Sequence, residues 1–203
     1  MTILDDVADQ LEYINNLSQL DPSRVKFVGD KKLKCQFSGN QYYATLVCGI
    51  PPRSSPLHYG FGPGNIDATG FSLDVEQALA SGWLRKRDVL VMNKSKIHTG
   101  GENTVLEDWL WSRHHIFVVY LPPNTPKWTP VTAVWKEATR EMKNISQNPY
   151  QRHSVVRAAE TVLDTFTSTV IAGKSVACRQ FASSPSSSPS SSKNSRVKRG
   201  SAA

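Results

Sequence analysis

The chain has 203 residues, which is enough for one ordinary domain with a sizeable core. Hydrophobic residues make up 39% and charged residues 20%, a composition typical of a globular protein and unlike that of a disordered one. No stretch approaches the roughly 18 consecutive apolar residues of a transmembrane helix. Acidic residues near the N-terminus argue against a signal peptide, and the three widely spaced cysteines fit no disulfide or zinc pattern. We therefore expect an intracellular protein with reduced thiols.

The C-terminal end differs from the rest of the chain. Residues 183–192 are almost all Ser and Pro, so we expect 182–203 to form a disordered tail. The net charge is +7, but four of the 24 basic residues lie in this tail, which leaves 20 against 17 acidic residues in the body. The basic end of the tail is interpreted either as a nuclear-localisation or phosphate-contacting patch, or as a solvated tail without a dedicated role. Its basic residues are Lys193, Arg196, Lys198 and Arg199.

The first half of the chain predicts three strands and a helix. Residues 25–30 form a short predicted strand that ends in an acid. Residues 41–50 are rich in aromatic and β-branched side chains and predict a second strand. The Pro-rich residues 51–56 predict a turn, and residues 57–61 the returning strand of a hairpin. A helix is expected to begin at Asp67.

The second half predicts an alternation of strands and helices. Residues 88–93 are an apolar run suited to a buried strand, and residues 116–121 are another. Between them, Asn103 or Thr104 is expected to cap a helix. Its expected apolar residues are Val105, Leu106, Trp109 and Leu110.

Two helices are predicted to close the ordered part, one from Pro130 to about Asn144 and one over about residues 152–170. Three meandering strands followed by helix-alternating strands predict an α/β fold, with a mixed sheet covered by helices. The ribonuclease H-like fold has this order of elements. We accordingly expect a helical lead-in over residues 1–20 and one ribonuclease H-like domain over residues 21–175.

Two segments carry motifs with fixed spacing. In residues 89–111 an apolar strand is followed, after a short gap, by the pair Ile97-His98. In residues 116–137 a strand runs into a series of prolines and a tryptophan at fixed offsets. These are Leu121, Pro122, Pro123, Pro126, Pro130 and Trp135. Both segments resemble catalytic blocks of mariner-like transposases of the DDE endonuclease superfamily.

A third segment, Asp21-Pro22-Ser23-Arg24 leading into Phe27 to Asp30, is similar to the first catalytic strand of the same family. Together the three segments span roughly residues 20–145. The resemblance implies a ribonuclease H-like fold, DNA as the partner and Mg²⁺ or Mn²⁺ as the cofactor. In such chemistry two divalent ions about 3.5–4 Å apart clamp the attacking and leaving oxygens.

The family's three metal-binding carboxylates fall on positions that have largely changed. The first corresponds to Asp30, which is retained and is the expected metal ligand. The second falls on Asn93 and the third on Thr132, both of which are neutral. Because Mg²⁺ prefers anionic oxygen ligands, the change from three negative charges to one predicts impaired metal binding and loss of two-metal catalysis. A residual nuclease that uses a single metal ion is the alternative enzymatic interpretation.

Several neighbouring residues have two interpretations. Lys94 and Lys96 follow the second catalytic strand and are interpreted as DNA-phosphate contacts, as are the four basic residues of the tail, or alternatively as solvent-facing charges. His98 is interpreted as a hydrogen-bonded structural residue or as a group near the cleft. We expect the tryptophans at helical spacing to lie in the core rather than to stack on bases. These are Trp109, Trp111, Trp128 and Trp135.

Two functional hypotheses follow. The first is a transposase-derived, nuclear DNA-binding domain with a degenerate active site, whose binding is nonspecific and weakened by salt. The second is an interaction or structural protein that keeps the fold without a nucleic-acid role, or a relic without function. The nearly neutral body favours the second hypothesis, and the resemblance favours the first.

Overall fold

The computed structural model describes residues 3–34, 41–49, 57–95, 101–123, 125, 128–146 and 155–166. The helices are α1 (Ile3–Ser18), α2 (Ala68–Ala80), α4 (Gly101–Trp109), α5 (Pro130–Ser146) and α6 (Val155–Leu163). Short helical turns cover Pro22–Arg24 and Leu110–His114. The strands are β1 (Val25–Lys34), β2 (Gln41–Gly49), β3 (His58–Pro63), β4 (Val89–Asn93) and β5 (Phe117–Leu121). Within these described ranges no helix is both long enough and apolar enough to cross a membrane.

The five strands form one mixed sheet in the order β3-β2-β1-β4-β5. β1, β2 and β3 pair antiparallel as a meander, whereas β4 is parallel to both β1 and β5. The chain thus adds strands to one side of β1 and then crosses to the other side. In open α/β sheets ligands bind at the carboxyl ends of strands next to such a reversal of strand order.

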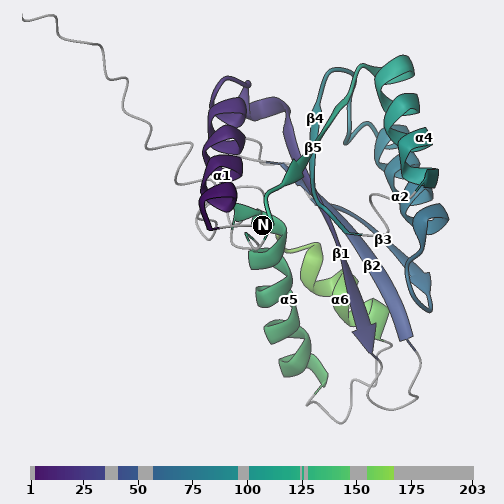
Figure 1. Cartoon of the computed structure of the whole chain (residues 1–203). Coiled ribbons are helices and arrows are strands. Elements are labelled where there is room, and N and C mark those ends of the chain that lie inside the picture. Colours follow the sequence, from purple (N-terminus) through teal and green to yellow (C-terminus); the bar gives the residue numbers. More distant parts are fainter. Residues whose placement is uncertain are drawn as a thin grey trace, which may run out of the picture.

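Helices cover both faces of the sheet (Figure 1). On one face the core joins residues of α1, α5 and α6 to alternate strand residues such as Phe27 and Val91. On the other face the core joins residues of α2 and α4 to strand residues such as Leu90 and Met92. Because successive residues of β4 enter opposite cores, this strand is buried on both faces, as its continuous apolar run predicts. The predicted α/β, ribonuclease H-like architecture is confirmed.

Asp67 caps α2 as predicted, since its carboxylate accepts a hydrogen bond of 2.7 Å from the backbone N–H of Gly70. Gly82 follows the helix with a φ of 72°, a left-handed conformation that favours glycine. The predicted turn at residues 51–56 lies outside the described residues. The hairpin on either side of it is present, because β3 pairs antiparallel with β2.

Two predicted element boundaries are wrong. β1 does not end at the acid but continues to Lys34, because β2 pairs with it along its whole second half. α4 begins at Gly101, so neither Asn103 nor Thr104 lies before the helix as its cap. Val105 was expected on the apolar side of this helix but is 68% exposed.

The last helix also differs from its prediction. α6 begins at Val155 and ends at Leu163, and the backbone then turns, with the N–H of Phe166 donating to the carbonyl of Leu163 at 3.0 Å. Phe166 is buried after this turn, so it joins the core from outside the helix. Residues 167–170 of the predicted helix lie outside the described residues.

Candidate functional site

A pocket of about 360 Å³ lies where β4 and β5 end and β1 continues. The parallel pairing of β1 with β4 runs as far as Phe27 and Val91. Two residues further along these strands stand Gly29 and Asn93, and Asp30 follows directly. The three positions that the sequence resemblance singled out, Asp30, Asn93 and Thr132, all line this pocket.

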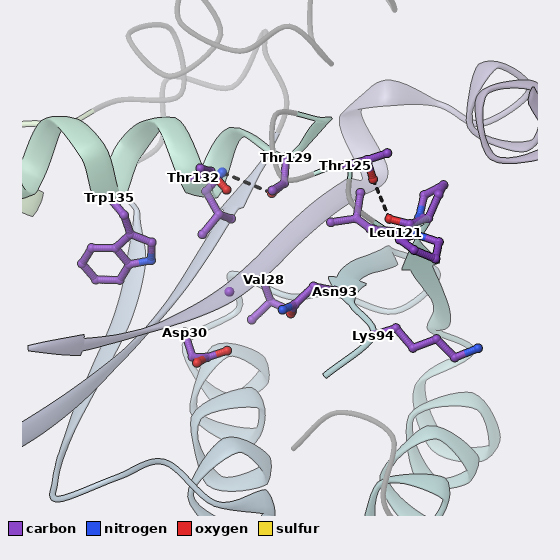
Figure 2. A pocket seen from close by; sticks show the side chains of 13 residues that line it. Val28, Asp30, Asn93, Lys94, Leu121, Thr125, Thr129, Thr132 and Trp135 are labelled. Atoms are coloured by element: carbon purple, nitrogen blue, oxygen red, sulfur yellow. Dashed lines mark hydrogen bonds between the residues drawn. The ribbon is translucent and has the colours of Figure 1, made fainter. Parts of the chain in front are cut away.

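Each of the three side chains comes from a different element (Figure 2). Asp30 projects from the middle of β1, where it stands opposite Thr45 of β2. Asn93 is the last residue of β4, and Thr132 is the third residue of α5. Asp30 is half-buried, whereas Asn93 and Thr132 are exposed. The pocket is therefore open to solvent on the side of the two neutral residues.

The close approach of β1 and α5 depends on Gly29. A Cβ atom at this position would lie 2.7 Å from Cγ1 of Val131, closer than such atoms pack in real structures. Val131 is buried in the first turn of α5, directly before Thr132. A glycine in β1 thus allows the start of α5 to reach the strand that carries Asp30.

The link between β5 and α5 is held by two threonines. The hydroxyl of Thr125, which is buried, donates a hydrogen bond of 2.6 Å to the carbonyl of Pro122. The hydroxyl oxygen of Thr129 accepts a 3.3 Å hydrogen bond from the N–H of Val131, which makes Thr129 the N-cap of α5. Pro130 then occupies the first helical position, where its missing N–H costs nothing. These contacts place the N-terminus of α5, with Thr132, at the pocket.

The pocket carries little negative charge. Asp30 is the sole carboxylate among the described residues that line it. Glu137 lies further along α5 and pairs with Arg140 at 2.5 Å. Asp88 precedes β4 at the other end of the strand, where it is buried beside the ammonium group of Lys26 at 4.0 Å. Neither acid can take the place of the two missing carboxylates.

Positive groups also face this region. Lys94 lines the pocket and is exposed, and its side chain points away from Asp30 (Figure 2). The N-terminus of α5 adds the partial positive charge of a helix dipole. Trp135 lines the pocket from the second turn of α5, and its buried indole N–H has no hydrogen-bond partner among the described residues.

The donor set does not fit the pair of divalent cations that the sequence resemblance implies. Two such ions require several anionic oxygen ligands, whereas Asp30, Asn93 and Thr132 offer one carboxylate, one amide and one hydroxyl. Within the described part of the chain there is also no cluster of three or more His, Cys, Asp or Glu side chains able to hold a metal ion.

Other predicted site residues have mixed outcomes. Lys96, His98 and the tail residues Lys193, Arg196, Lys198 and Arg199 lie outside the described residues.

Trp128 and Trp135 are buried at 7% and 5% exposure, as expected of core residues. Trp109 is half-buried, but Trp111 is 49% exposed, so its assignment to the core is wrong. Trp111 follows the buried Leu110 and, at about 100° per residue, lies about 140° around the helix axis from Leu106, outside the apolar stripe of α4.

Two residues that shape the pocket were missed by the sequence reasoning. Gly29 was treated only as part of a strand, although a glycine inside a strand signals a close backbone approach. Thr129 was not recognised as a cap, although a threonine directly before Pro130 is a helix-start signal.

The sheet order, the two helical layers and the pocket at the strand ends define a ribonuclease H-like domain of the kind found in transposase catalytic cores. Solved structures of one such protein share this fold. In the Mos1 strand transfer complex the TM-score is 0.61 at 9% identity, covering 87% of this chain and 56% of that chain. For the Mos1 transposase catalytic domain with raltegravir and Mg the TM-score is 0.56 at 10% identity, covering 87% of this chain and 86% of that chain.

A third similar structure is the Mos1 transposase paired-end complex with the left transposon end. Its TM-score is 0.54 at 9% identity, covering 80% of this chain and 60% of that chain. The chain therefore spans well under two thirds of the transposase chains in the two complexes but most of the isolated catalytic domain. The sequence matches no protein-family model and no curated protein. At these identities the comparisons establish the fold, which is that of the Mos1 transposase catalytic domain.

Proposed function

We propose that this chain is a transposase-derived DNA-binding domain whose metal-dependent strand cleavage is impaired. One observation carries the proposal: Asp30, Asn93 and Thr132, which were selected from the sequence motifs alone, line one pocket at the carboxyl ends of the parallel strands. Two of the three hold neutral side chains. The pocket therefore keeps the position of a transposase active site without the charges that its chemistry needs.

The charge balance of the pocket suits a DNA phosphate better than a pair of dications. With three carboxylates such a pocket would repel phosphate unless metal ions were bound. Here the single charge of Asp30 lies near the N-terminus of α5, and the exposed Lys94 adds a positive charge beside the pocket. The N-terminus of a helix favours anions through its dipole.

The binding we propose is nonspecific and electrostatic, with contributions from Lys94, Lys96 and the basic tail. It should therefore weaken steeply as salt is raised. We further propose that the tail directs the protein to the nucleus. The rival function, an interaction protein without a nucleic-acid role, is favoured by the nearly neutral balance of basic and acidic residues in the body.

Titration of a labelled DNA duplex at several salt concentrations separates these functions. The full-length chain is compared with a variant in which Lys193, Arg196, Lys198 and Arg199 are changed to Ser, and with Lys94→Ser. We expect the tail variant to bind the duplex with a reduced but measurable affinity. Adding Lys94→Ser to the tail variant should lower the affinity further. If neutralising the tail abolishes binding, the folded body has no DNA contact of its own and the interaction function is favoured.

A further inference from the structure

A second pocket, of about 420 Å³, lies at the opposite end of the sheet from the candidate active site. It is formed at the amino ends of β1, β4 and β5, where Val89 and Phe117 begin their strands. A five-residue strand such as β4 spans about 16 Å, so the two pockets are separate sites. We call this second site the aromatic–basic pocket. It is lined by Leu20, Asp21, Arg24, Arg87, Val89, Trp111, His115 and Phe117.

Two large aromatic side chains are exposed there. Trp111 is 49% and Phe117 54% exposed, and their ring centroids are 4.4 Å apart at an interplanar angle of 44°. The imidazole ring of His115 also packs against Trp111, with the two ring centroids 5.5 Å apart. Exposed aromatic surface is unfavourable in water. Two adjacent solvent-exposed aromatic side chains therefore indicate a binding surface.

The backbone around the pocket is unusual in three respects. Arg87 and His115 have φ angles of 68° and 53°, and they are the two non-glycine residues with positive φ in the described part of the chain. The turn that presents Trp111, Leu110–His114, is a π-helix. Rare conformations of this kind cost free energy and gather at functional sites.

Hydrogen bonds hold these conformations in place. The N–H of Arg87 donates to the carbonyl of His114 at 3.1 Å, and the N–H of His115 donates to the carbonyl of Trp111 at 2.9 Å. The carboxylate of Asp88 accepts from the N–H of Arg85 at 2.9 Å and closes the turn before β4. The aromatic pair and the Arg87 side chain are therefore presented by a rigid frame, which lowers the entropy lost on binding.

The charge of the pocket favours an anion. Arg24 and Arg87 both line it and are exposed. The guanidinium of Arg87 makes no hydrogen bond or ion pair with any described residue. Asp21 is the opposing charge, but it is already engaged, since it caps the turn before β1 through the N–H of Ser23 at 2.9 Å and lies 3.7 Å from Arg24.

We propose that the aromatic–basic pocket binds unpaired nucleotides of a single-stranded nucleic acid. A base stacks on Trp111 beside Phe117, and the adjoining phosphate pairs with Arg87. Aromatic platforms next to basic side chains are the recognised means of binding single strands without sequence preference. The inference extends the proposed DNA-binding function to a second site and rests on that function only for the class of partner.

The test is a fluorescence-anisotropy titration of the full chain with a short labelled oligothymidine at low salt. Trp111→Ala is expected to weaken binding about fivefold or more, the usual effect of removing one stacking platform. Leu73→Ala is the matched control, because Leu73 is a 53% exposed apolar residue on α2, outside the pocket. The control should bind like the native chain.

Arg87→Gly separates binding from folding. Glycine adopts the left-handed conformation of residue 87 without strain, so this variant should unfold at the same or a higher temperature than the native chain while binding the oligonucleotide more weakly. If Trp111→Ala and Arg87→Gly both bind like the native chain, the proposal is overturned. The proposed function would still stand in that case, because it rests on the duplex titration.

The same variants also test whether this surface binds a second copy of the chain. If the surface instead joins two copies of this chain, sedimentation will show native dimers that Trp111→Ala dissociates while oligonucleotide affinity stays unchanged, and the proposal is again overturned.

Discussion

Gly29 of β1 and Val131 of α5 are packed so closely that a Cβ atom at residue 29 would lie 2.7 Å from Cγ1 of Val131. The two residues are the immediate neighbours of Asp30 and Thr132. The missing side chain at residue 29 thus determines how near the first and third positions of the candidate site lie to one another. This contact can be tested without any assumption about activity.

Gly29→Ala should lower the free energy of unfolding by about 1–3 kcal/mol, because the added methyl group overpacks a buried contact. Urea denaturation measures the loss. Val131→Ala removes the clashing methyl groups, so Gly29→Ala should cost clearly less in that background. An equal cost in both backgrounds would mean that the strain arises elsewhere in β1.

Asp74 of α2 predicts a dependence of stability on pH. Its side chain is buried at 5% exposure, and Oδ2 has no hydrogen-bond partner among the described residues. Burial raises the pKa of Asp74, and the neighbouring Thr45 hydroxyl offsets part of the rise. The native state therefore holds its proton to higher pH than the unfolded chain does, and the free energy of unfolding falls as pH rises from about 4 through the raised pKa.

Asp74→Asn removes this titration while keeping the shape of the side chain. We expect the variant to be more stable than the native chain at neutral pH and the difference to shrink as pH approaches 4. Thermal unfolding across this range measures it. A difference that grows toward acid pH would show that Asp74 is stabilised as a carboxylate.

Tyr13 carries a second unpartnered polar group. It is buried at 7% exposure, and its ring stacks on Trp128 with centroids 5.7 Å apart. Its hydroxyl has no hydrogen-bond partner among the described residues, and burial raises the pKa of Tyr13. A buried, unsatisfied hydroxyl costs about 1–3 kcal/mol, so Tyr13→Phe should stabilise the fold by about 1 kcal/mol.

Tyr13→Ala is the companion variant for α1. It removes the stacked ring as well as the hydroxyl and should destabilise the fold by about 3–5 kcal/mol. Chemical denaturation of both variants measures these changes in the free energy of unfolding. A destabilised Tyr13→Phe would indicate that the hydroxyl has a partner beyond the described residues.

The sheet was largely predictable from the sequence because its strands are marked by continuous apolar runs with clear breaks. β4 and β5 lie within the predicted ranges 88–93 and 116–121, each beginning one residue later, and β2 and β3 pair as the expected hairpin. The convergence of Asp30, Asn93 and Thr132 in one pocket was also expected, through motif spacing. Each of these signals is local in sequence.

The features that were missed depend on contacts between distant segments. β1 continues past Asp30 because β2 pairs with it, which no local pattern in β1 reveals. Trp111 packs against Phe117 at the start of β5, and the left-handed backbone of Arg87 is accompanied by a hydrogen bond to His114. The aromatic–basic pocket combines these features, and apolar periodicity alone assigned its tryptophan to the core.

We propose that the pocket holds a transposase-type site that has lost two of its three carboxylates. The most direct test is Mg²⁺- or Mn²⁺-dependent nicking of a labelled duplex by the native chain and by the double variant Asn93→Asp, Thr132→Glu. We predict that the native chain is silent, that the double variant nicks, and that adding Asp30→Ala to it abolishes the cleavage. Nicking by the native chain that Asp30→Ala abolishes would contradict the loss of catalysis.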